Sequence, residues 1–89
     1  MSEQMSEADK EFKELGFIKK EVDNLIIYEK YFKTKQKHEL IRKVIGFNKV
    51  KKEVYGFDSY NGIDYSLGID IPLNILKIIN KKCKELGWI

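Results

Sequence analysis

The fold is decided by the C-terminal stretch Ile71–Ile89, which has the sequence IPLNILKIINKKCKELGWI. Its apolar residues recur at the spacing of one face of an α-helix. That face comprises Leu76, Ile79, Cys83 and Leu86, widened by Ile75. The remaining faces are polar and hold Asn80, Lys81, Lys82, Lys84 and Glu85. The pattern predicts an amphipathic helix that covers a core with its apolar face.

Both ends of this helix are marked in the sequence. Pro72 suits the first turn, where its missing N–H removes no intrahelical bond, and Asp70 is the expected N-cap acceptor. Gly87 supplies the left-handed residue that ends many helices. Trp88 follows at the position where an apolar residue folds back onto the last turn, so we expect it to close the core.

The N-terminal segment repeats this plan. Its apolar residues have the same spacing, at Met5, Ala8, Phe12 and Leu15, and KELGFI at residues 13–18 parallels KELGWI at residues 84–89. Ser6 with Asp9 resembles the start of a capping box. The favoured interpretation is that two helices use the same C-terminal stop. The alternative is an ancient duplication, or packing of the two helices side by side.

Between the helices, β-branched and aromatic runs predict strands, separated by turn residues. The expected strands are residues 25–32, 38–47, 52–57 and 63–69, after a polar link at residues 18–24. The segment from Asp58 to Gly62 has the residue types of a turn.

Short connections between these strands favour an antiparallel meander. We therefore expect one α+β domain over residues 1–89, with residues 1–5 frayed. Its order is α-β-β-β-β-α, a four-stranded meander with the two terminal helices packed on one face, leaving the other face exposed or free to bind.

Length and composition exclude several classes of protein. The chain has 89 residues and one cysteine, so it forms no internal disulfide framework. The polar N-terminus does not resemble a signal peptide, and no apolar run is long enough to span a membrane. We expect a soluble protein of the cytoplasm that has no membrane partner.

Positive charge is concentrated in the middle of the chain. The net charge is only +3, yet residues 30–52 hold nine lysines or arginines against one acid, Glu39. These basic residues are Lys30, Lys33, Lys35, Lys37, Arg42, Lys43, Lys49, Lys51 and Lys52. Together with Tyr28 and Tyr31 they are the candidate contact residues, because amines neutralise phosphates and aromatic rings stack on bases. The alternative is a solvated, lysine-rich edge that discourages sheet pairing. A single arginine argues against dedicated base reading.

No catalytic or metal-binding pattern stands out. His38 is the only histidine, and Cys83 falls on the apolar helix face, where cysteine is usually a packing residue. Asp58, Asp64 and Asp70 are evenly spaced but lack the glycine and glutamate positions of a calcium loop. We expect no enzyme activity, no cofactor and no metal; an enzyme would require a pocket that gathers His38 or these aspartates.

The helix ends, the strands around Tyr28 and Phe47, and above all the closing motif INKKCKELGW at residues 79–88 resemble small uncharacterised proteins of Firmicutes phages and prophages. Ile71-Pro72-Leu73 departs from the expected Ser/Thr helix cap, and the middle of the chain is more basic than usual. The resemblance implies an accessory protein in the host cytoplasm. Such a protein would bind a host protein or protein–nucleic-acid complex, as an anti-defence (anti-CRISPR-like) inhibitor.

This non-catalytic binding role is the leading hypothesis. The alternative is a nucleic-acid-binding protein that uses the region from Lys30 to Lys52. An exposed edge strand would also allow a homodimer.

Overall fold

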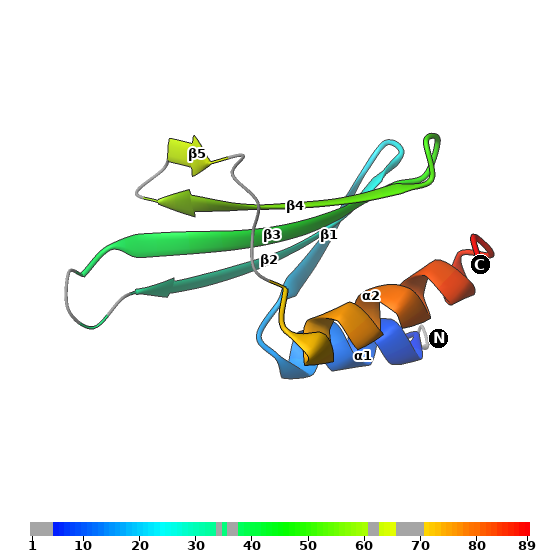
Figure 1. Ribbon diagram of the computed structural model, residues 1–89, viewed down its shortest axis with the longest axis horizontal. Helices are drawn as coiled ribbons and strands as arrows, with labels where there is room; N and C mark the ends of the chain where they lie inside the picture. The colour runs from blue at the N-terminus through cyan, green and yellow to red at the C-terminus, as the bar shows by residue number, and fades with distance from the viewer. Residues whose placement is uncertain (1–4, 34, 36–37, 61–62, 66–70) are drawn as a thin grey trace.

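The computed structural model describes residues 5–33, 35, 38–60, 63–65 and 71–89 (Figure 1). Its elements are α1 (Glu7–Glu14), β1 (Ile18–Val22), β2 (Leu25–Lys33), β3 (Leu40–Asn48), β4 (Glu53–Tyr60), β5 (Ile63–Tyr65) and α2 (Leu73–Glu85). The strands form one antiparallel sheet in the order β1-β2-β3-β4-β5. The two helices lie side by side on one side of the sheet (Figure 1). The predicted α+β meander between two terminal helices is confirmed.

The polar link expected at residues 18–24 is instead strand β1 and its turn. β1 pairs with β2 from Ile18 opposite Glu29 to Val22 opposite Leu25, and Asp23 in the turn has a φ of 53°. All residues of β1 are exposed. An edge strand without a buried face needs no alternation of apolar and polar residues, so the pattern that reveals other strands is missing here.

Two strand boundaries differ from the prediction. β3 begins at Leu40, because His38 has a φ of 53° and cannot continue a strand. The residues from Asp58 to Tyr60, expected in a turn, belong to β4 and pair with β3. Asn61, Gly62 and residues 66–70 lie outside the described residues, so β5 is described only as far as Tyr65.

The expected ends of α1 are confirmed. Ser6 Oγ accepts a hydrogen bond from the backbone N–H of Asp9 at 3.1 Å. At the other end Gly16 has a φ of 95°, and the N–H of Phe17 donates to the carbonyl of Phe12 at 3.0 Å. This C-terminal motif satisfies a carbonyl that the helix leaves unpaired and turns Phe17 back toward the core.

Helix α2 ends in the same way but begins differently. Gly87 has a φ of 77°, and the N–H of Trp88 donates to the carbonyl of Cys83 at 2.9 Å. Pro72 is the N-cap residue rather than part of the first turn, and its side chain makes no capping hydrogen bond. Asp70, the expected cap, lies outside the described residues. The shared helix stop predicted from the two KELG segments is therefore real.

The core lies between the helices and the facing side of the sheet. Phe12 stacks on Tyr28 with ring centroids 4.0 Å apart and meets Phe47 edge to face. From α2 the buried residues are Ile75, Ile78, Ile79 and Lys82. Trp88 packs partly buried against this cluster. The core thus combines aromatic rings in edge and stacked contacts with isoleucines from both layers.

The orientation of α2 differs from the apolar face read from the sequence. Leu76 is 50% exposed, whereas Lys82, expected on a polar face, is only 6% exposed. The helix is rotated so that Ile75, Ile78 and Ile79 point inward and the Lys82 ammonium enters the core. A buried ammonium requires a compensating anion, and Asp9 provides it.

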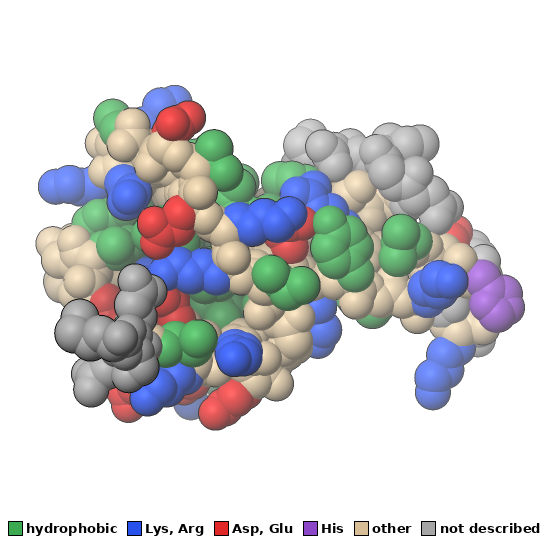
Figure 2. Space-filling view, turned by 180° about the vertical axis from the view of Figure 1, so that it is seen from behind, with side chains coloured by type: hydrophobic (Ala, Val, Ile, Leu, Met, Phe, Trp, Pro, Cys, Tyr) green, Lys and Arg blue, Asp and Glu red, His purple; other side chains and the backbone are tan. Residues whose placement is uncertain are grey.

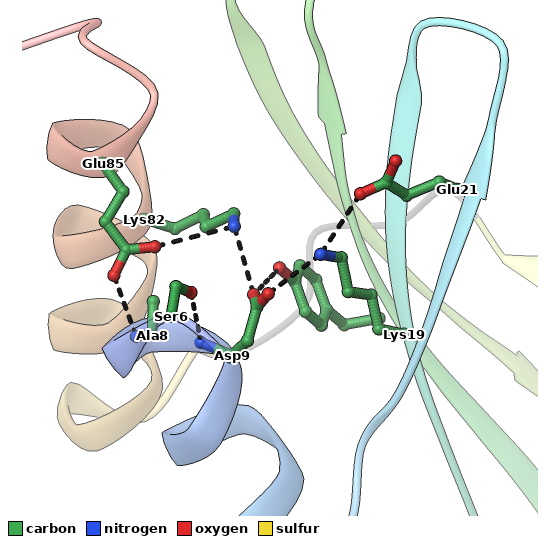
Figure 3. A network of polar contacts seen from close by, with 8 residues as sticks. Ser6, Ala8, Asp9, Lys19, Glu21, Lys82 and Glu85 are labelled. Carbon is green, nitrogen blue, oxygen red and sulfur yellow. Dashed lines mark hydrogen bonds and ion pairs between the residues drawn. The ribbon is translucent and has the colours of Figure 1, made fainter. Parts of the chain in front are cut away.

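Asp9 is the centre of a buried polar network that joins both helices to the sheet (Figure 3). Its Oδ1 lies 3.1 Å from Lys82 Nζ of α2, and its Oδ2 lies 2.9 Å from Lys19 Nζ of β1. The hydroxyl of Tyr28 on β2 donates a further hydrogen bond to Oδ1. One carboxylate therefore connects four elements, namely α1, α2, β1 and β2.

Ionisation of this network follows from its contacts. Desolvation acts to raise the pKa of Asp9, but hydrogen bonds from Lys19, Tyr28 and Lys82 outweigh it and lower the pKa from 3.8 to about 2. Burial, and then the hydrogen bond to Asp9, raise the pKa of the Tyr28 phenol. The folded protein therefore holds Asp9 as a carboxylate and Tyr28 as a neutral donor.

Removing the charge of Asp9 should cost much more stability than removing that of Lys82. Asp9→Asn leaves the buried Lys82 ammonium with only the more distant Glu85 carboxylate, 3.6 Å away, and losing one partner of a buried ion pair costs about 3–5 kcal/mol. Lys82→Met leaves Asp9 with Lys19 and Tyr28 as donors and should cost about 1 kcal/mol or less, because a matched apolar side chain fills the space. Urea unfolding of both variants tests this. Equal losses would show that the network does not depend on Asp9.

Acid should destabilise the protein through the same group. Because the folded pKa of Asp9 lies below the unfolded value of 3.8, its contribution is present above that value and is lost as pH falls toward about 2. A shift of this size corresponds to about 2 kcal/mol. Unfolding curves between pH 5 and pH 2 should show this loss in the wild type and a flatter profile in Asp9→Asn. Identical profiles would contradict the assignment.

Candidate functional site

The side of the sheet that faces away from the helices is the first candidate surface. Strand alternation and the register of β2, β3 and β4 place one set of side chains there. This helix-free face carries Ile27, Glu29, Tyr31, Arg42, Val44, Gly46, Tyr55, Phe57 and Ser59. Tyr31 is 51% exposed, whereas Val44 beside the centre is 1% exposed. Large side chains therefore cover the middle of this face without help from a helix.

A buried carboxylate organises the helix-free face. Glu29 is 2% exposed and its Oε2 accepts hydrogen bonds from Arg42 Nε and from the Tyr31 hydroxyl, each at 2.9 Å. Lys20 Nζ of β1 lies 2.9 Å from Oε1. The hydrogen bond from Arg42 is the main cause that lowers the pKa of Glu29 to about 2, against desolvation. Glu29 thus fixes Arg42 and Tyr31 in place and neutralises part of the positive charge around it.

Aromatic rings lie beside this network on β4. The rings of Tyr55 and Phe57 are nearly parallel, with centroids 6.4 Å apart, and the Arg42 guanidinium lies 5.7 Å from the centre of the Phe57 ring. Tyr55 reaches across β3 over Gly46, where an added Cβ would fall 2.0 Å from Tyr55 Cζ. Gly46 is therefore the position that allows the tyrosine ring to lie flat on the sheet.

The basic stretch at residues 30–52 does not form one patch. Lys33 and Lys35 lie at the β2–β3 end, and Lys49, Lys51 and Lys52 lie in the β3–β4 turn at the opposite end (Figure 1). β3 has 9 residues, so the two ends are about 25–30 Å apart. Lys and Arg side chains are spread among hydrophobic ones in the view from behind (Figure 2). Residues that are neighbours in the sequence are thus separated in space.

The remaining candidate contact residues fall in three environments. Tyr28 is 1% exposed in the core and is not a surface residue, which corrects its assignment as a contact. Arg42 is on the helix-free face and is held by Glu29. Lys30 and Lys43 point to the helix side, and Lys43 Nζ lies 3.3 Å from Asp58 Oδ1. Lys37 lies outside the described residues.

No arrangement for covalent or metal chemistry is found in the part of the chain that the structure describes. His38 is exposed at the β2–β3 end, and Cys83 lies on α2 at the edge of the core, where burial raises the pKa of its thiol. No three His, Cys, Asp or Glu side chains in the described ranges are grouped to hold a metal ion. Asp70 and the side chain of Asp64 are outside them. Neither described helix is long and apolar enough to cross a membrane.

Comparisons with protein families, with curated proteins and with solved structures found no match for this chain. The resemblance to small phage proteins therefore stays a prediction, and the candidate site rests on this chain's residues.

Sequence reasoning missed the centre of the helix-free face. Glu29 was not singled out, because a single acid within a strand has no distinctive spacing. Tyr55 and Phe57 were visible as an alternating pair around Gly56, and Gly46 interrupts an apolar strand. A glycine within a strand often marks a close approach of another group, which is the signal that could have identified this face.

Replacing Gly46 should disturb the helix-free face, because the Tyr55 ring lies directly on this residue. In Gly46→Ala the new methyl group would overlap the Tyr55 ring, so the ring must leave the sheet. Overpacking of this kind costs about 1–3 kcal/mol. Urea unfolding measures the loss, and the double variant Gly46→Ala with Tyr55→Ser should recover part of it. No loss in the single variant would show that Tyr55 does not rest on Gly46.

Proposed function

We propose that the protein is a non-catalytic binding protein that contacts a host protein through the helix-free face of its sheet. One observation carries the proposal. The centre of this face is aromatic, and a buried glutamate already neutralises its arginine and pairs with the exposed Lys20 of β1. The exposed lysines of the basic stretch lie at the two ends of the face.

This distribution matches the anatomy of a protein–protein interface. Such interfaces have a core enriched in Tyr, Phe and Arg and depleted of Lys, surrounded by a polar rim. Tyr31, Tyr55 and Phe57 supply rigid contact area on the face, and the Glu29 carboxylate holds Tyr31 and Arg42 in place before a partner arrives. Pre-organised side chains lose little conformational freedom on binding, which favours affinity.

Nucleic acid is the second candidate partner, and one observation favours it. Lys33 and Lys35 at one end of the sheet and Lys49, Lys51 and Lys52 at the other are all exposed, and aromatic rings lie between the ends. A single strand could follow the sheet from one end to the other. Binding of this kind would fall steeply with salt, because each phosphate contact releases counterions.

The role of an anti-defence inhibitor in the host cytoplasm rests on the resemblance of the INKKCKELGW segment at residues 79–88 to phage proteins. A protein of that class acts by occupying a host protein, which agrees with a contact surface that performs no chemistry. The interface proposal itself depends only on the helix-free face.

A pull-down of the tagged protein from host lysate, with and without nuclease, tests the proposal. Two variants are compared with the wild type: Tyr31→Ser with Tyr55→Ser on the helix-free face, and Lys49→Gln with Lys51→Gln and Lys52→Gln at one end. We expect a protein partner that survives nuclease. Its recovery should fall about tenfold or more in the tyrosine variant, as for interface hot spots, and stay near wild type in the lysine variant.

Circular dichroism and thermal unfolding of both variants show whether they fold. A partner that disappears with nuclease and with the lysine variant would overturn the protein-interface proposal in favour of nucleic acid. A partner insensitive to the tyrosine variant would place the contact elsewhere.

A further inference from the structure

A groove of about 500 Å³ lies on the helix side of the sheet, away from the proposed interface. The end of α1, the first turn of α2 and strands β2 and β3 form its walls. Apolar side chains make up most of the lining, among them Phe17, Phe32, Pro72 and Ile75. Two lysines, Lys30 and Lys43, are the charged groups in it. An apolar groove of this size with a few polar groups is typical of a small-molecule site.

The two lysines are placed where their charges repel each other. Lys30 and Lys43 are directly opposite in the register of β2 and β3, and both line the groove. Side chains directly opposite in an antiparallel pair have Cβ atoms about 4.5–5.5 Å apart, and like charges there are unfavourable. This arrangement opposes folding unless an anion lies nearby, so it indicates a site for a negative group.

Among the residues that the structure describes, one carboxylate pairs with these lysines. Lys43 Nζ lies 3.3 Å from Asp58 Oδ1, which is buried and has no hydrogen-bond partner. In the described part of the chain no carboxylate lies within ion-pair distance of Lys30, whose ammonium is 6.0 Å from the centre of the Phe17 ring. The first turn of α2 holds no acidic residue. Counting the described residues alone, the groove therefore has one positive charge that is not balanced.

We propose that this groove binds a small organic monoanion with an apolar tail, of which a medium-chain carboxylate is the simplest case. The head group would lie between the ammonium groups of Lys30 and Lys43. The tail would lie against Phe17, Phe32 and Ile75, which already wall the groove. A single negative charge would balance the excess of the site, and the tail would remove apolar wall from water.

The experiment is a calorimetric and NMR titration of the whole protein with four probes: octanoate, octylammonium, 1-octanol and acetate. The first three share a tail and differ in head-group charge, and acetate has the head without the tail. We expect saturable binding of octanoate, with amide shifts at Lys30, Lys43 and Ile75. 1-Octanol and acetate should each bind about tenfold more weakly, and octylammonium should not bind.

Substitutions of Lys30 test whether its charge binds the octanoate head group. Lys30→Gln should weaken octanoate binding about tenfold, and Lys30→Arg should restore it. Lys33→Gln is the matched control, because Lys33 lies on the same strand but is exposed and does not line the groove. The NMR spectra show whether each variant is folded. Octanoate binding that Lys30→Gln leaves unchanged, 1-octanol binding as tightly as octanoate, or no saturable binding at all would each overturn the proposal.

Discussion

The buried carboxylate of Asp9 is the interaction on which the rest of the structure depends. It lies in the first turn of α1 yet accepts from Lys82 of α2, Lys19 of β1 and Tyr28 of β2. A chain this short has a thin core, so a polar contact shared by four elements has a large influence on how they are oriented. This contact also explains the rotation of α2, because the helix must place the Lys82 ammonium beside the Asp9 carboxylate.

Much of the architecture was predictable because it depends on local chemistry. The glycine stops at Gly16 and Gly87, the Ser6 cap and the β-branched and aromatic composition of the central strands each have one strong physical cause. The predictions were wrong where a residue's environment depends on parts of the chain that are distant in sequence. β1 is held by its pairing with β2 and by the contact of Lys19 with Asp9, and Lys82 is buried because Asp9 arrives from the other end of the chain. Helical periodicity alone therefore predicts that Lys82 is exposed to solvent.

The candidate site was harder to predict for a related reason. A run of basic residues in the sequence suggests one positive surface, but a hairpin separates its turns, and strand alternation sends adjacent residues to opposite faces. Tyr28 and Tyr31 were predicted to act together, yet one is in the core and the other is exposed. What the sequence could not show was the partner of each charge, which depends on the pairing of β2, β3 and β4.

Two ion pairs made by β3 also fix its register against β2 and β4. Arg42 meets Glu29 on one face, and its neighbour Lys43 meets Asp58 on the other. If β3 slid by one residue, each cation would point to the wrong side. The buried Glu29 would then keep only Lys20 of β1, and the half-buried Asp58 would lose Lys43. The ion pairs on the two faces therefore select one register of β3. Apolar residues on both faces of this strand would not select it by themselves.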